Sequence, residues 1–267
     1  MSRPGYRGTV AGMDGYGGDQ IRAAERPHLD AGEPLMQRAA DGLAAVVAGL
    51  LYDPAVRPGD GPGSVLLLVG SGDNGGDALF AGARLASAGR HVTLLRVGSR
   101  VHEAGLAAAL EAGVQDIGDA RPVTPAGAGT ADVLRAAVSP SDGDRLAAVA
   151  RDAALEADLV LDGVLGIGTR AAGGLRSPAR EVVGALRELA RDQRAPFVVA
   201  VDVPSGIDAD TGGIADDHVL HADVTVTFGG VKAGLLRGPG ATLAGRIELV
   251  DVGIGADLAT VEPLVRT

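Results

Sequence analysis

The chain has no cysteine and no tryptophan among its 267 residues, and aromatic residues make up only 2% of it. Without cysteine there is no disulfide, thiolate nucleophile or cysteine metal site, which fits a reducing cytoplasm. So few rings give single-stranded nucleic acid no surface to stack on, and a net charge of −10 repels phosphate backbones. We therefore expect a cytoplasmic protein that does not bind nucleic acid.

Long apolar runs are also missing. No run approaches the roughly 18 residues of a membrane span, and the N-terminal residues lack the apolar stretch of a signal peptide. Apolar residues still make up 46% of the chain, enough for a sizeable core built from aliphatic side chains and alanine. The composition therefore predicts a globular protein with no membrane partner.

Three segments share one pattern, in which a run of aliphatic residues is followed by a polar loop containing glycine. They cover residues 64–70, 158–162 and 197–202. Unbroken aliphatic strands indicate a sheet covered on both faces, and strands that alternate with helices indicate parallel pairing. The pattern predicts an α/β fold with a mainly parallel sheet.

The remaining elements follow from the same periodicity. The glycine-rich residues 1–18 predict a flexible N-terminal arm and residues 19–267 one domain, with a long loop at 113–141. Further strands are expected at 91–97, 223–228 and 246–251, and helices at 19–26, 33–51, 75–88, 102–112, 142–156 and 178–191.

The loop Gly70-Ser-Gly-Asp-Asn-Gly75 has the spacing GxGxxG after a predicted strand and before a predicted helix. Such a loop can hold a phosphate at a helix N-terminus, although a plain tight turn gives the same spacing. A dinucleotide site needs an acidic residue about 20 residues later. Arg96 stands there instead, which would suit NADP and leaves an NADP-linked oxidoreductase open.

Acidic residues in and beside this loop complicate phosphate binding. Asp73 and Asp77 would repel a phosphate unless a cation lies between them, and Asn74 offers a neutral oxygen ligand for such an ion. Asp77 also suits the first turn of a helix, where it would offset the helix dipole. The loop therefore predicts a bound cation, with a purely structural Asp77 as the alternative.

Two aspartates end predicted strands, Asp162 and Asp202. The carboxyl ends of parallel strands meet at one edge of the sheet, where active sites form, and desolvation there suits a carboxyl group to proton transfer. Each could also simply cap the turn that follows it. Ser205, in Val201-Asp-Val-Pro-Ser-Gly206, lacks the GxSxG context and a histidine partner, so a hydrolase is disfavoured.

The remaining charged candidates are few. Lys232 is the chain's single lysine and could contact a phosphate or a carboxylate, or lie solvated at the surface. His218 and His221 are three residues apart, but no carboxylate spacing completes a known metal site around them. We expect both histidines to be exposed or structural.

Taken together, these segments resemble the NAD(P)H-hydrate epimerase family, also called the YjeF N-terminal domain. The resemblance runs from about residue 20 to 253 and rests on four ordered stretches: Leu35-Met-Gln-Arg-Ala39, Gly70–Asp77, Asp162–Gly168, and Val201–Asp208 with Asp210-Thr-Gly212, Asp223–Phe228 and Lys232. It implies a Rossmann-like three-layer α/β/α sandwich, often a homodimer. The implied reaction interconverts the R and S epimers of hydrated NADH or NADPH, which repairs a damaged cofactor.

The resemblance also implies site residues. One potassium ion per subunit would be held by Asn74, Asp162 and Ser205. We take Asp202 as the catalytic acid and base. The hydrated cofactor would contact three groups of residues: Asp73, Asn74, Gly75, Gly76 and Asp77; Gly166, Ile167, Gly168, Thr169, Arg170, Ala171 and Ala172; and Asp202.

Two departures from the family pattern matter. Asp73 stands where the family usually has asparagine, and Ala78 where it often has glycine, so Asp73 adds a negative charge beside the substrate. The chain also ends soon after the epimerase region, and we expect a separate NAD(P)H-hydrate dehydratase to be its functional partner. A non-catalytic nucleotide-binding module of the same fold is the remaining alternative, disfavoured by the presence of Asp162, Asp202 and Ser205.

Overall fold

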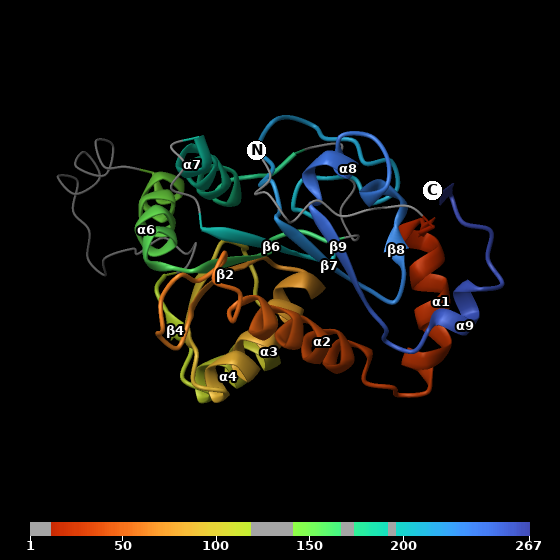
Figure 1. The fold of residues 1–267 in the computed structure, drawn as a ribbon, viewed down its shortest axis with the longest axis horizontal. Helices are drawn as coiled ribbons and strands as arrows, with labels where there is room; N and C mark the ends of the chain where they lie inside the picture. The colour runs from red at the N-terminus through yellow and green to blue at the C-terminus, as the bar shows by residue number, and fades with distance from the viewer. Residues whose placement is uncertain (1–11, 119–140, 167–173, 192–195) are drawn as a thin grey trace, which may run out of the picture.

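The computed structural model describes residues 12–118, 141–166, 174–191 and 196–267. Its centre is a sheet in which every neighbouring pair is parallel, in the order β4-β3-β2-β5-β6-β7-β9 (Figure 1). The strands are β2 (Ser64–Val69), β3 (His91–Arg96), β4 (Gln115–Asp116), β5 (Leu159–Gly163), β6 (Phe197–Val201), β7 (Val224–Phe228) and β9 (Arg246–Val250).

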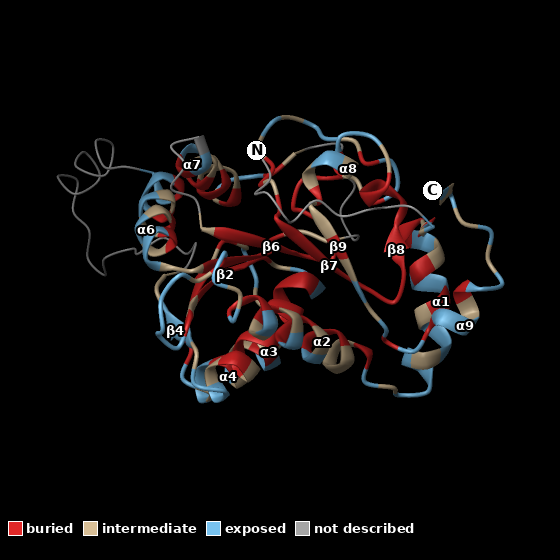
Figure 2. Ribbon diagram, viewed as in Figure 1, coloured by how far each residue is buried: buried red, intermediate tan, exposed pale blue. Residues whose placement is uncertain are grey.

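Helices cover both faces of this sheet, because successive strand side chains point to opposite sides. On β2, Leu67 belongs to a core cluster with residues of α1, α2, α3 and α4, whereas Leu66 and Leu68 belong to one with α6 and α7. Figure 2 shows buried residues concentrated along the strands and the inner helix faces. The helices are α1 (Gly18–Asp30), α2 (Leu35–Leu50), α3 (Asp73–Ser87), α4 (Glu103–Glu111), α6 (Asp142–Glu156) and α7 (Ala179–Arg191).

The predicted three-layer α/β/α sandwich is therefore confirmed, and its topology locates the site. From β2 the chain builds β3 and β4 on one side, and then β5, β6, β7 and β9 on the other. The direction of winding reverses between β2 and β5. A crevice at such a reversal, outside the carboxyl ends of the strands, is where open α/β sheets bind ligands.

A second, small sheet flanks α1. It contains β1 (Asp14–Tyr16), which pairs in parallel with β8 (Val231–Lys232) and antiparallel with β10 (Val265–Arg266). The predicted flexible arm 1–18 therefore ends too late, because residues 14–16 are hydrogen-bonded into a sheet and α1 begins at Gly18. Residues 1–11 of that arm lie outside the described residues.

The three further strands and the six helices predicted from the sequence are all present, with bounds shifted by a few residues at most. Residues 115–116, inside the predicted loop 113–141, form β4, while 119–140 lie outside the described residues. The short elements η2 (Ala233–Leu235), α8 (Gly240–Leu243) and α9 (Gly255–Leu258) complete the domain. In the described part of the chain, no helix has the length and apolar character needed to cross a bilayer.

Candidate functional site

A buried carboxylate ends β5 beside the loop that follows β6. Asp162 is 1% exposed, and its Oδ1 accepts a hydrogen bond from the Ser205 hydroxyl at 2.6 Å while its Oδ2 accepts one from the Ser205 backbone amide at 2.9 Å. Burial raises the pKa of Asp162, and the Ser205 hydrogen bonds oppose that rise. Among the described residues, no cationic side chain forms an ion pair with it. Hydrogen bonds alone therefore offset this carboxylate.

The amide of Asn74 joins the glycine loop to the ends of the two neighbouring strands. Its Nδ2 donates to the carbonyl oxygen of Leu165 at 3.2 Å and to that of Val201 at 2.5 Å. The Ser205 hydroxyl accepts from the backbone amide of the same Leu165 at 2.8 Å. Residues after β2, β5 and β6 therefore meet in one place, which is the close neighbourhood that the proposed ion site requires.

Glycine allows these loops to touch. A Cβ on Gly70 would lie 1.8 Å from the carbonyl oxygen of Val164, and a Cβ on Gly166 would lie 2.1 Å from Oδ1 of Asn74. A side chain at Gly70 would force the loop after β2 away from the backbone after β5, and one at Gly166 would displace the Asn74 amide. These two glycines are thus explained by close contacts within the protein, before any ligand is considered.

A buried ion pair lies next to this contact. Asp202, directly after β6, is 4% exposed, and Lys232 on β8 is 1% exposed, with its Nζ 2.5 Å from Oδ1 of Asp202. Lys232 also donates to the carbonyl oxygen of Phe228 at 2.8 Å, and the Thr227 hydroxyl donates to Asp202 at 3.1 Å. Lys232 contacts a carboxylate, as one prediction had it, and the surface alternative is wrong.

The backbone of Asp202 is strained. Its φ is +67°, the only positive φ of a non-glycine residue in the described ranges. Aspartate and asparagine tolerate this left-handed region better than most residues, and such conformations cluster at functional sites. The amide of Asp202 donates to the carbonyl oxygen of Val226 at 2.7 Å, which helps to hold the turn.

Two more carboxyl groups face this ion pair. Asp77, on α3, is 6% exposed, and its pKa is raised well above the usual range by burial and then by Asp202 and Asp73, against an opposing effect of Lys232. Burial also raises the pKa of Glu25, on α1, which is influenced by Lys232, Asp202 and Asp73. The region therefore holds several acidic groups and one lysine.

Sequence reasoning missed Glu25. A signal for it existed, because Glu25 lies one helical turn after the fully buried Ile21 and so on the apolar side of α1. Ile21 in turn approaches Gly230, just before β8: a Cβ on that glycine would lie 2.8 Å from Ile21 Cδ1. An acidic residue within the apolar pattern of a helix is the feature that could have drawn attention.

The other predicted site residues fall into three groups. Asp73 is exposed as the first residue of α3, and Gly75 and Gly76 are buried in its first turn. Gly166 contacts Asn74 as described. Residues 167–172, predicted to contact the hydrated cofactor, lie outside the described residues: Ile167, Gly168, Thr169, Arg170, Ala171 and Ala172.

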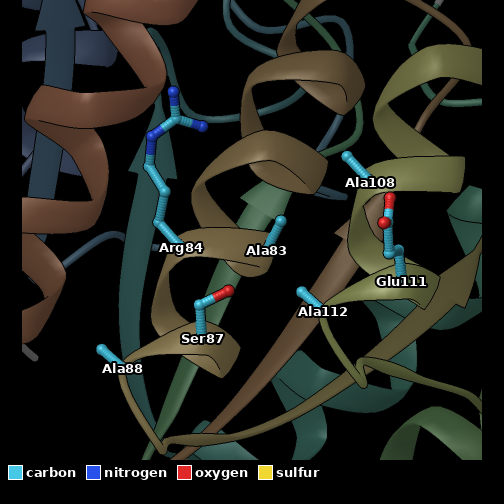
Figure 3. A pocket seen from close by; sticks show the side chains of 7 residues that line it. All are labelled: Ala83, Arg84, Ser87, Ala88, Ala108, Glu111 and Ala112. Atoms are coloured by element: carbon cyan, nitrogen blue, oxygen red, sulfur yellow. The ribbon is translucent and has the colours of Figure 1, made fainter.

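A shallow groove between α3 and α4 is unrelated to this site (Figure 3). Small side chains line most of it, including Ala83, Ala108 and Ala112, together with Arg84 and Glu111. It lies near the C-terminal end of α3, about 15 Å along the helix from Asn74, since each residue adds about 1.5 Å. Its position gives it no part in the chemistry at the sheet edge.

One alternative from the sequence loses its support, because Arg96, the candidate reader of an NADP phosphate, pairs with Asp116 at 2.7 Å.

The sequence predicts no metal site around His218, yet this residue lies close to two carboxylates, Asp216 and Asp217, in a group that could hold a metal ion. Arg180 pairs with Asp216 and Arg187 with Asp217, so their charges are already offset.

Comparison with known families agrees with this geometry. Residues 32–234 match the family model described as YjeF-related protein N-terminus. The chain belongs to this family. The matched region includes the ends of β2, β5 and β6 with the loops that follow them, and also Lys232.

Three similar relatives carry an activity in their names. An NAD(P)H-hydrate epimerase of Clavibacter michiganensis is 48% identical over 253 residues, covering 95% of each chain. One of Microbacterium testaceum is 45% identical over 250 residues, covering 94% of this chain and 82% of that one. A bifunctional NAD(P)H-hydrate repair enzyme of Mycobacterium tuberculosis is 39% identical, and this chain aligns with 43% of it.

A solved structure supports the fold of this YjeF family member. The crystal structure of a yeast protein superposes with a TM-score of 0.60 at 18% identity, covering 83% of both chains. At that identity the likeness concerns the architecture alone. It agrees with the three-layer sandwich and the parallel central sheet.

Proposed function

We propose that this chain is an NAD(P)H-hydrate epimerase, an isomerase that interconverts the R and S epimers of hydrated NADH and NADPH. Its YjeF family membership and its near full-length similarity to proteins named for this activity support the reaction. The observation that carries the proposal in the structure is the strained, buried Asp202 paired with Lys232, beside the meeting point of Asn74, Asp162 and Ser205.

We further propose potassium as the bound ion, with Asn74, Asp162 and Ser205 as its side-chain ligands. These groups offer oxygen atoms, which alkali and alkaline-earth cations prefer. Asp162 fits the role because it is a buried carboxylate offset by hydrogen bonds and by no described cationic side chain. A large monovalent ion would supply charge neutralisation and order between the loops. It is a poor Lewis acid, so the proton transfers fall to side chains.

The chemistry needs a group that handles protons at carbon 6 of the reduced nicotinamide ring. That carbon carries the hydroxyl group and neighbours the ring nitrogen, whose lone pair can help to expel it. Protonation of the departing oxygen gives water and a planar cation, to which water can return on either face. We propose that Asp202 takes part in these transfers, which typically contribute about 10²–10⁴-fold in rate.

The test is Asp202→Asn, with the two hydrate epimers followed by chromatography. Asparagine keeps the shape and tolerates the left-handed backbone, so the variant should fold. We expect the rate to fall by about 10²–10⁴-fold. Glu103→Gln, an exposed acidic residue in the first turn of α4, is the matched control and should keep the wild-type rate. A wild-type rate in Asp202→Asn would remove this residue from the mechanism.

Two partners complete the proposal. A separate dehydratase acting on the S epimer would consume the product. The relative from Mycobacterium tuberculosis that is named a bifunctional repair enzyme supports this link, because this chain aligns with 43% of it and the rest of that chain leaves room for a second activity. We also propose a homodimer, which light scattering on the purified chain would test directly.

A further inference from the structure

Asp77 is a buried carboxyl group that nothing in the fold accounts for. It is 6% exposed in α3, one turn after Asn74, and no hydrogen bond or ion pair to its carboxyl group occurs among the residues that the structure describes. Acidic residues at helix starts are favourable where they meet the free backbone amides, but they are normally solvated. A purely structural role would not need an acidic residue that is nearly enclosed and has no protein partner for its carboxyl group.

The charges around Asp77 favour its protonated form. The groups that act on it are Asp202 after β6, Asp73 at the start of its own helix, Glu25 on α1 and Lys232 on β8. Burial is the first cause that raises the pKa of Asp77, and the three acidic groups raise it further against the opposing effect of Lys232. A buried carboxyl group without a cation keeps its proton, because ionisation there is costly.

Lys232 does not supply that missing cation, because it is already committed. Its Nζ lies 2.5 Å from Asp202 and its side chain is 2% exposed. This ion pair engages Asp202, whereas Asp77 has no such partner among the described residues. The chain has no other lysine to pair with Asp77. The two carboxyl groups therefore occupy opposite electrostatic settings within one cluster.

We propose that Asp77 and Asp202 divide the proton transfers of epimerisation, with Asp77 as the general acid and Asp202, held by Lys232, as the general base. This rests on the proposed epimerase function and assigns Asp77 a catalytic role. Pairs of titratable groups held in contrasting environments are a recurring way to separate acid from base in one active site.

The Asp77 carboxyl proton moves to the departing oxygen, the bond from carbon 6 to that oxygen breaks, and the ring nitrogen lone pair forms the double bond of the planar cation. Water then bonds to carbon 6 as its extra proton passes to Asp202. The product is neutral, and one proton must return from Asp202 to Asp77 before the next turnover. The two residues thus share one proton, and their roles exchange in the reverse direction.

The first test measures protonation without any assay of activity. Infrared difference spectra of the full-length protein at neutral pH, wild type minus Asp77→Asn, should show the carbonyl stretch of a protonated carboxyl group. The same band should persist in Asp202→Asn. Absence of the band from the wild type at neutral pH would overturn the assignment of Asp77 as an acid.

The second test is kinetic. Asp77→Asn should lower kcat by about 10²–10⁴-fold with little change in KM, whereas Asp77→Glu, which keeps the acid, should recover part of the loss. Thermal unfolding would show that each variant folds, and Glu103→Gln again serves as the control. A wild type without epimerase activity would refute the proposed function itself. An active wild type, with Asp77→Asn equally active and Asp202→Asn impaired, would refute only the division of roles.

Discussion

Replacing Lys232 with methionine tests the electrostatic centre of the site. The two side chains are similar in length, so Lys232→Met keeps most of the packing and removes the charge. In the native protein both members of the pair are almost fully enclosed, with side-chain exposures of 2% for Lys232 and 6% for Asp202. The variant would leave Asp202 as a buried carboxylate with no cation.

The size of the effect follows from that burial. Removing one partner of a buried ion pair typically costs 3–5 kcal/mol, since the remaining charge is left without compensation. The hydrogen bond from Lys232 to the carbonyl oxygen of Phe228 is lost as well. At about 2 °C per kcal/mol for a domain of this size, the melting temperature should fall by about 6–10 °C. Epimerisation should slow in parallel, because Asp202 loses the group that holds it in place.

Chemical denaturation of the two single variants and the double variant provides the assay. If the cost arises from an uncompensated carboxylate, adding Asp202→Asn to Lys232→Met should restore a large part of the lost stability. Asparagine suits the φ of +67° at this position, so the second substitution adds little strain. A loss below about 1 kcal/mol in Lys232→Met, or no recovery in the double variant, would refute this reasoning.

Two further predictions concern other parts of the molecule. Hydrogen bonds from His28 to Asp257 and Glu33 raise the pKa of His28, so its contribution to stability is full below the unfolded pKa of about 6.5 and is lost as pH rises through the folded pKa. His28→Asn should therefore lower the free energy of unfolding more at about pH 6 than at about pH 8.5. An equal effect at both pH values would contradict this prediction. Gly166→Ala should abolish epimerisation, because its Cβ would lie 2.1 Å from Oδ1 of Asn74. Gly49→Ala on α2, where a Cβ meets open space, is the control and should keep the activity. An active Gly166→Ala would show that this contact is dispensable.

The main sheet was predictable because its strands are long aliphatic runs. In β2 and β5 both faces are buried, so no alternation blurs the pattern, and the glycine loops mark where each strand ends. The same logic placed Asp162 and Asp202 at one sheet edge, and the contacts of Asn74 with Leu165 and Val201 agree with it. The strands and the residues that end them could therefore be identified from the local sequence alone.

The rest depends on contacts between distant parts of the chain. The three residues of β1 are too few to show a period, and they pair with β8 and β10 near the opposite end of the sequence. The burial of Lys232 follows from the same small sheet, since it pairs with Tyr16. Periodicity could not reveal that Glu25, Asp77 and Asp202 share one electrostatic cluster, because they come from three separate elements.

The most direct measurement mixes the purified chain with a racemic NADH or NADPH hydrate and a dehydratase that acts on the S epimer alone. With an epimerase present, the R epimer is drawn through the S form, and the whole hydrate pool should be consumed far faster than it epimerises spontaneously. If half of the hydrate disappears quickly and the remainder decays at the spontaneous rate with or without the chain, the proposed activity is wrong.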